Sequence, residues 1–121
     1  SSPALGRKVA RAADWADGGC VVELGAGTGA ISRALLAAGL PAEQLCLVEI
    51  VPEMAAHLRA AVPGAEVVTG DAFALPDILP WRMRGRVSTV ICGIPLVLLP
   101  EARQRAFAAA AEGAAPGRGF L

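Results

Sequence analysis

Apolar residues fall in two kinds of segment along this chain: short runs almost without polar interruption, and longer alanine-rich stretches with helical spacing. A short apolar run bounded by turn residues is typical of a strand buried on both faces, as in a parallel sheet. Four runs have this character. The predicted strands are 20–24, 45–49, 65–68 and 87–92.

The alanine-rich stretches between these runs predict helices. The first begins near Pro3 and has apolar residues at helical spacing as far as Ala16, before Gly18 and Gly19 stop it. Further helices are predicted over 30–38, 52–61, 73–79 (a short one) and 100–112. Strands and helices therefore alternate, which is the pattern of an α/β fold.

This alternation predicts a Rossmann-like open parallel sheet with helices on both faces. Right-handed crossovers, with a glycine turn after the first strand, predict the strand order 3-2-1-4. The segment 118–121 has the pattern of the start of a fifth strand beside the fourth. The expectation is thus a single domain over residues 1–121 that lacks its C-terminal part, and self-association through the exposed sheet edge is predicted.

Composition narrows the functional classes. The 121 residues carry eleven Lys and Arg against eleven Asp and Glu, so the chain lacks the basic excess on which DNA binding normally depends. Its longest uncharged stretch, Val87–Pro100, is too short to cross a bilayer. Its three cysteines show no C-x-x-C spacing, so neither a disulfide framework nor a metal site is predicted, and a cytoplasmic location is expected.

The segment Glu23–Gly29 joins the first strand to a helix through three glycines, which allow a sharp turn and a close backbone approach to a ligand. Residues Gly25–Ala30 also satisfy the dinucleotide pattern G-x-G-x-x-[GA], so a nicotinamide cofactor is an alternative. However, Glu23 beside the turn disfavours a pyrophosphate and suits a ligand that carries an ammonium group. S-adenosylmethionine is such a ligand.

Two further carboxylates follow the next strands. Glu49 ends the second strand at a spacing from which it can accept hydrogen bonds from both ribose hydroxyls. Asp71 follows the third strand and can accept a hydrogen bond from an adenine amino group, although capping of the next helix is a structural alternative. Because the carboxyl ends of parallel strands share one edge of a sheet, these groups are expected to converge with the glycine turn.

With these motifs the sequence resembles the class I S-adenosylmethionine-dependent methyltransferases from its first helix to the start of the fifth strand. The resemblance implies that the glycine loop faces the methionine part of the cofactor, Glu49 the ribose, Asp71 the adenine, and the segment from Gly93 the methyl group. Adenine packing at Ile50 would be apolar. The predicted cofactor-binding residues are Glu23, Gly25, Ala26, Gly27, Thr28, Glu49, Ile50, Asp71, Ala72 and Gly93; no catalytic base is predicted.

Gly93-Ile94-Pro95-Leu96, together with the earlier motifs, is similar to bacterial phospholipid N-methyltransferases, which are related to the ribosomal-RNA adenine dimethylases. The resemblance implies phosphatidylethanolamine as methyl acceptor, at the inner face of a membrane. The dimethylases place an amide and an aromatic ring where this chain has Gly93 and Leu96, which disfavours an adenine acceptor. Adenine methylation and a cofactor-binding module without turnover remain the alternatives.

Overall fold

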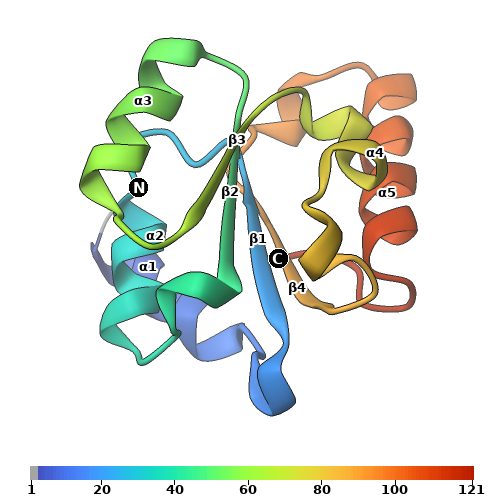
Figure 1. The fold of residues 1–121 in the computed structure, drawn as a ribbon. Helices are drawn as coiled ribbons and strands as arrows, with labels where there is room; N and C mark the ends of the chain where they lie inside the picture. The colour runs from blue at the N-terminus through green and yellow to red at the C-terminus, as the bar shows by residue number, and fades with distance from the viewer. Residues whose placement is uncertain (1–2) are drawn as a thin grey trace.

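Four parallel strands form the centre of the computed structural model, which describes residues 3–121 (Figure 1). Their order across the sheet is β3-β2-β1-β4, so the predicted order is confirmed. Each neighbouring pair is parallel. The strands are β1 (Cys20–Leu24), β2 (Leu45–Glu49), β3 (Glu66–Thr69) and β4 (Val87–Cys92).

Helices cover both faces of the sheet, in two layers that Figure 1 shows on its left and right sides. One layer contains α1 (Pro3–Ala12), α2 (Ala30–Ala37) and α3 (Pro52–Ala61). The other contains α4 (Leu75–Ile78) and α5 (Glu101–Ala114). Short 3₁₀ turns lie at η1 (Ala16–Gly18), η2 (Ala42–Gln44), η3 (Ala72–Ala74), η4 (Trp81–Met83) and η5 (Leu96–Leu98).

Alternate residues of each strand enter two separate apolar cores. On β1, Val21 packs under α1, α2 and α3 with Leu35 and Leu58. Val22 faces the opposite way and packs with Leu75 and other residues of the α4 and α5 layer. All five residues of β1 and of β2 are buried, which explains why these strands read as continuous apolar runs.

The first helix is shorter than predicted. It ends at Ala12 rather than continuing through Ala16, because the chain turns to bind β4. The Asp14 amide donates to Thr89 Oγ1 at 2.8 Å, and the Asp14 carbonyl accepts from the hydroxyls of Ser88 and Thr89. These contacts with a strand 75 residues away leave no local signal in the sequence.

Other boundaries move by smaller amounts. The predicted strand 65–68 is displaced by one residue, since the Ala65 amide bonds to Val62 in the turn that closes α3. The predicted helix 73–79 is a 3₁₀ turn followed by the single turn α4, and the helix predicted over 100–112 occupies 101–114.

The predicted fifth strand is present only as one paired residue. Leu121 donates its amide to the Val90 carbonyl at 2.8 Å and accepts from the Cys92 amide at 2.9 Å. This is the hydrogen-bond pattern of a parallel neighbour on the outer side of β4. Within residues 3–121, no helix has the length and apolar character needed to cross a membrane.

Candidate cofactor site

Two adjoining cavities open at the carboxyl ends of the strands, where an open parallel sheet binds its ligands. Their volumes are about 330 Å³ and about 340 Å³. Both are lined by Gly25, Gly93, Ile94 and Pro95, so the cavities form one crevice in two halves. We name the half beside α2, which contains Glu23, the loop cavity, and the half beside β3, which contains Asp71, the strand-end cavity.

The loop between β1 and α2 depends on its glycines. Gly25, Gly27 and Gly29 have φ values of 69°, 58° and 87°, in the left-handed region that residues with a Cβ rarely adopt. The Gly25 amide donates to the Val48 carbonyl at 2.8 Å, which fixes the loop to the end of β2. The loop therefore borders the crevice mainly with its backbone, as a ligand-binding turn requires.

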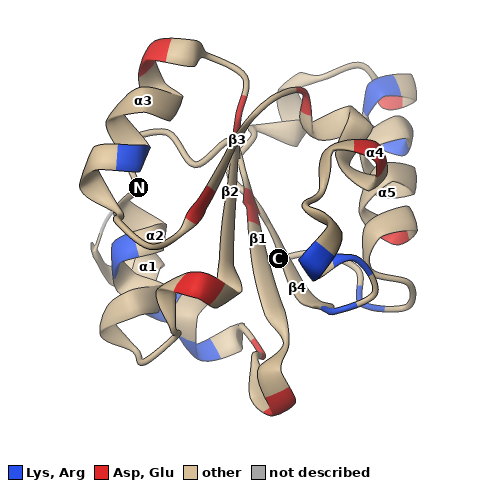
Figure 2. Cartoon of the chain, in the orientation of Figure 1, with Lys and Arg blue, Asp and Glu red and all other residues tan. Residues whose placement is uncertain are grey.

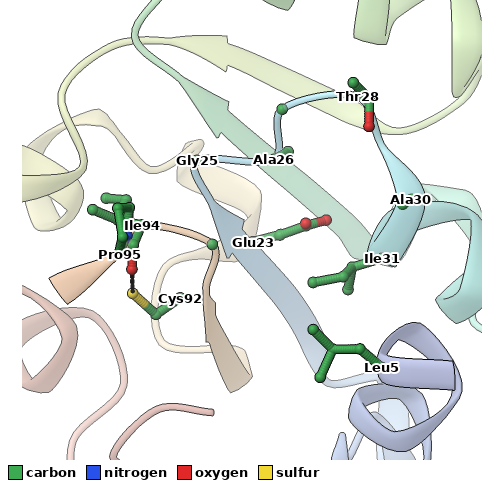
Figure 3. Close-up of a pocket in the computed structure, with 12 residues that line it drawn as sticks. Leu5, Glu23, Gly25, Ala26, Thr28, Ala30, Ile31, Cys92, Ile94 and Pro95 are labelled. Carbon is green, nitrogen blue, oxygen red and sulfur yellow. Dashed lines mark hydrogen bonds between the residues drawn. The ribbon is translucent and has the colours of Figure 1, made fainter. Parts of the chain in front are cut away.

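Gly93 lies in close contact with the end of β1 and the start of the glycine loop. Its amide donates to the Leu24 carbonyl at 2.7 Å, and a Cβ at this position would lie 2.5 Å from the Gly25 carbonyl oxygen. The next residues, Ile94 and Pro95, form the wall opposite α2 (Figure 3). The predicted importance of Gly93 thus has a steric basis, since no side chain fits there without moving the glycine loop.

Glu23 lies at the floor of the loop cavity with only 1% of its surface exposed. Its Oε1 accepts a hydrogen bond from the Ser32 hydroxyl at 2.6 Å. Its side chain points from β1 toward the start of α2, near Ile31 (Figure 3). Burial raises the pKa of Glu23 to about 7, and the hydrogen bond from Ser32 opposes that rise.

Glu49 has a role in the protein itself that sequence reasoning missed. Its two carboxylate oxygens accept from the backbone amides of Gly27 and Val51, each at 3.1 Å, so it braces the glycine loop against the end of β2. A carboxylate has about four acceptor positions. Glu49 therefore keeps capacity for ligand hydroxyls while it holds the loop.

Asp71 also makes a structural contact. Its Oδ1 accepts from the Phe73 amide at 2.9 Å, so the capping alternative raised from the sequence is confirmed. Asp71 nevertheless lines the strand-end cavity, together with Ala72 and with Ile50, which is 62% exposed. Capping occupies one of its oxygens.

All ten residues predicted to bind a cofactor line one or both halves of the crevice. The loop cavity contains Glu23, Gly25, Ala26, Gly27, Thr28 and Gly93. The strand-end cavity contains Gly25, Glu49, Ile50, Asp71, Ala72 and Gly93. Their contacts with a ligand stay predictions.

Several lining residues were not among the predicted cofactor-binding residues. They are Leu5, Ala30, Ile31 and Cys92 in the loop cavity, Val48, Gly70, Phe73 and Arg103 in the strand-end cavity, and Ile94 and Pro95 in both, although Ile94 and Pro95 belong to the segment that the resemblance places beside the methyl group. Their signal was position: most lie on, just before or just after segments already placed at the carboxyl ends of strands. Leu5 and Arg103 had no such signal, because the first turns of α1 and α5 reach the crevice only through the packing of those helices.

The charges in the crevice are mostly negative. Lys and Arg occur only on helices and loops, whereas three of the acidic residues, Glu23, Glu49 and Glu66, occur on strands (Figure 2). Of the residues lining the two cavities, Glu23, Glu49 and Asp71 are acidic and Arg103 is the single cation. Such a crevice suits a ligand with positive charge and disfavours a pyrophosphate.

Comparison with known proteins identifies this architecture. Residues 21–117 match the family described as methyltransferase domain. The chain belongs to that family. This confirms the resemblance to the class I S-adenosylmethionine-dependent methyltransferases, and the match covers the glycine loop, all four strands and α5.

Several individual methyltransferases are similar to this domain. An ornithine lipid N-methyltransferase of Singulisphaera acidiphila is 35% identical over 108 residues, which cover 87% of this chain and 56% of that protein. An amino pentose methyltransferase of Micromonospora echinaspora, solved with S-adenosylmethionine bound, superposes with a TM-score of 0.69 at 26% identity over 98% of this chain and 47% of its own. The CcbJ methyltransferase of Streptomyces caelestis superposes with a TM-score of 0.73 at 28% identity, over 99% of this chain and 52% of CcbJ. The chain thus spans about half the length of these relatives.

Three basic residues that could meet lipid phosphates, Arg82, Arg84 and Arg86, lie just before β4. They are therefore at the amino end of the sheet, away from the crevice. Arg82 donates to the Glu43 carbonyl and pairs with Glu66, and Arg84 donates to the carbonyls of Leu79 and Asp77. Both side chains therefore have partners within the domain.

Proposed function

We propose that this domain binds S-adenosylmethionine along the crevice and takes part in methylating the amine of a membrane lipid. The observation that carries the proposal is the convergence of three carboxylates on a glycine loop that backbone contacts hold open. The loop cavity fits the aminocarboxylate half of the cofactor, with Glu23 facing its ammonium group. The strand-end cavity fits adenosine, with Glu49 at the ribose hydroxyls and Asp71 at the adenine amino group.

The residues present fit this cofactor chemically as well as by position. Glu23 and Glu49 are nearly buried, yet each keeps acceptor capacity beyond the contacts it makes. Gly93 presents backbone where a Cβ would meet a carbonyl oxygen, so this stretch of the wall between the cavities is bare main chain. When bound, S-adenosylmethionine supplies a methyl group on a sulfonium for in-line displacement by a nucleophile.

The titratable groups that line the crevice are Glu23, Glu49, Asp71, Arg103 and Cys92. In this proposal the three carboxylates bind the cofactor, so none of them is assigned to take a proton from the acceptor. The Cys92 thiol donates to the Ile94 carbonyl at 3.2 Å, and burial raises its pKa, so it stays protonated at neutral pH. The domain therefore contributes through positioning, and the acceptor amine has to arrive neutral.

A lipid amine is the acceptor class that we propose. Support comes from the ornithine lipid N-methyltransferase relative and from the apolar surface beside the crevice, where Val97 and Leu98 are strongly exposed and Leu5 and Ile50 partly so. Phosphatidylethanolamine, which the family resemblance implies, and an ornithine lipid both have a headgroup with a primary amine and an anionic group.

Two measurements test this proposal. Calorimetric titration with S-adenosylhomocysteine and with NAD tests the cofactor, and we expect only the first to bind. Transfer of labelled methyl to vesicles containing phosphatidylethanolamine or ornithine lipid, with phosphatidylcholine vesicles as control, tests the acceptor. Binding of S-adenosylhomocysteine with no transfer to either amine lipid would leave a cofactor-binding module, whereas NAD binding would refute the cofactor assignment.

A further inference from the structure

Among residues 3–121, Arg103 is the only basic residue that lines the crevice. It lies in the first turn of α5 and borders the strand-end cavity together with Asp71 and Ile50. Its guanidinium carbon is 3.7 Å from the centroid of the Phe73 ring. Arginine commonly stacks flat on aromatic rings in this way, which leaves its N–H groups directed outward around the edge of the plane.

Phe73 is a fixed platform for this stacking. Its amide is held by Asp71, and its ring meets the fully buried ring of Phe107 edge-on, with centroids 5.9 Å apart. A guanidinium resting on a fixed ring loses less freedom when it binds a ligand than a free arginine does. The position of Arg103 at the cavity wall is therefore built into the local packing.

The donors of Arg103 are unused within the domain. Its side chain makes no ion pair and no hydrogen bond with any of residues 3–121, whereas Arg105, two residues further along α5, pairs with Glu101 at 3.7 Å. Two arginines on one helix thus differ in environment. Arg105 pairs with Glu101 on the outer surface, whereas Arg103 lines the strand-end cavity.

We propose that Arg103 determines specificity for the nucleobase, by donating a hydrogen bond to a ring nitrogen of the adenine whose amino group Asp71 accepts. This inference rests on the proposed function, which puts adenosine in the strand-end cavity. Adenine has an acceptor nitrogen on each side of its amino group, N1 and N7. The Asp71 carboxylate accepts from the amino group, and the Arg103 guanidinium donates to the neighbouring ring nitrogen. A base with a carbonyl in place of the amino group would place its carbonyl oxygen against the Asp71 carboxylate, and both of these groups are acceptors.

The test compares Arg103→Ala and Arg103→Lys with the matched control Arg105→Ala. Calorimetry gives the affinity of each for S-adenosylhomocysteine and for 5′-methylthioadenosine, which lacks the aminocarboxylate. We expect Arg103→Ala to weaken both ligands by the same factor, about three- to tenfold as for one partly exposed hydrogen bond, and Arg105→Ala to change neither. Arg103→Lys keeps the charge but cannot stack as a plane, so it should fall between them.

Analogues of S-adenosylhomocysteine with CH in place of N1 or of N7 identify the acceptor. The unmodified chain should bind one of the two analogues more weakly than it binds S-adenosylhomocysteine. Arg103→Ala should bind that analogue and S-adenosylhomocysteine with equal affinity, because it lacks the donor. Unchanged affinity of Arg103→Ala for both nucleosides would overturn the inference and leave the proposed function standing, and so would a loss confined to S-adenosylhomocysteine. Failure of the unmodified chain to bind either nucleoside would overturn the proposed function and this inference with it.

Discussion

Replacing Glu23 with glutamine tests the electrostatics of the crevice directly. Glutamine keeps an oxygen for the Ser32 hydroxyl and removes only the charge. The pKa of Glu23 is raised to about 7 in the folded domain from an ordinary value of 4.5. Since one unit of pKa corresponds to about 1.4 kcal/mol, ionising this buried carboxyl lowers the free energy of unfolding by about 3 kcal/mol.

The pH range of this effect follows from the direction of the shift. The unfolded chain releases the Glu23 proton near pH 4.5, whereas the folded domain retains it up to about pH 7. The folded state therefore binds more protons between these values, and stability falls as pH rises through this window and then levels off. The glutamine variant lacks this contribution.

Urea unfolding at pH 5, 6, 7 and 8 measures the difference. We expect Glu23→Gln to gain stability relative to the unmodified chain as pH rises, by up to about 3 kcal/mol between pH 5 and pH 8. The comparison uses the change in the free energy of unfolding with pH. Any destabilisation by the glutamine amide that is the same at every pH therefore cancels. Parallel curves for the two proteins would refute the raised pKa and with it the picture of Glu23 as a carboxyl made costly by burial.

Three other predictions concern the crevice and the sheet edge. Gly93→Ala should destabilise the domain by about 1–3 kcal/mol in urea unfolding and abolish S-adenosylhomocysteine binding, because the new Cβ would overlap the Gly25 carbonyl. Glu49→Ala should weaken that binding by about 1–3 kcal/mol in calorimetry, since ribose hydroxyls and the Gly27 amide lose an acceptor; unchanged affinity would rule out the ribose assignment. Self-association through the outer edge of β4 stays a prediction, for which sedimentation velocity should show concentration-dependent oligomers.

Local patterns in the sequence were sufficient for the sheet and for the position of the crevice. Buried parallel strands read as apolar runs, and the strand ends carrying Glu23, Glu49 and Asp71 meet at one edge for any right-handed βαβ succession. The glycine pattern located the carboxyl end of β1. The strand order and the ten predicted lining residues followed from these few facts.

Long-range contacts account for what the sequence did not reveal. The early end of α1 depends on the bonds from Asp14 to Ser88 and Thr89, which lie far along the chain. Arg103 reaches the crevice because α5 packs Phe107 against Phe73. Neither contact follows from spacing or composition, since each is set by how two elements pack in three dimensions.

Each carboxylate proposed to meet the cofactor already holds part of the protein in place. Glu23 is bonded to Ser32, Glu49 to the glycine loop, and Asp71 to the Phe73 amide. These donors offset part of the cost of gathering three acidic groups in one crevice, and a cationic ligand would offset more of it. Alanine variants therefore remove a structural contact together with a ligand contact. The amide variants Glu23→Gln and Asp71→Asn keep an acceptor for the single structural bond, whereas Glu49→Gln can keep only one of the two bonds that Glu49 accepts. Since Glu23 is the carboxylate proposed to face the ammonium group, the loss of affinity in Glu23→Gln measures how far the crevice is built for a cation.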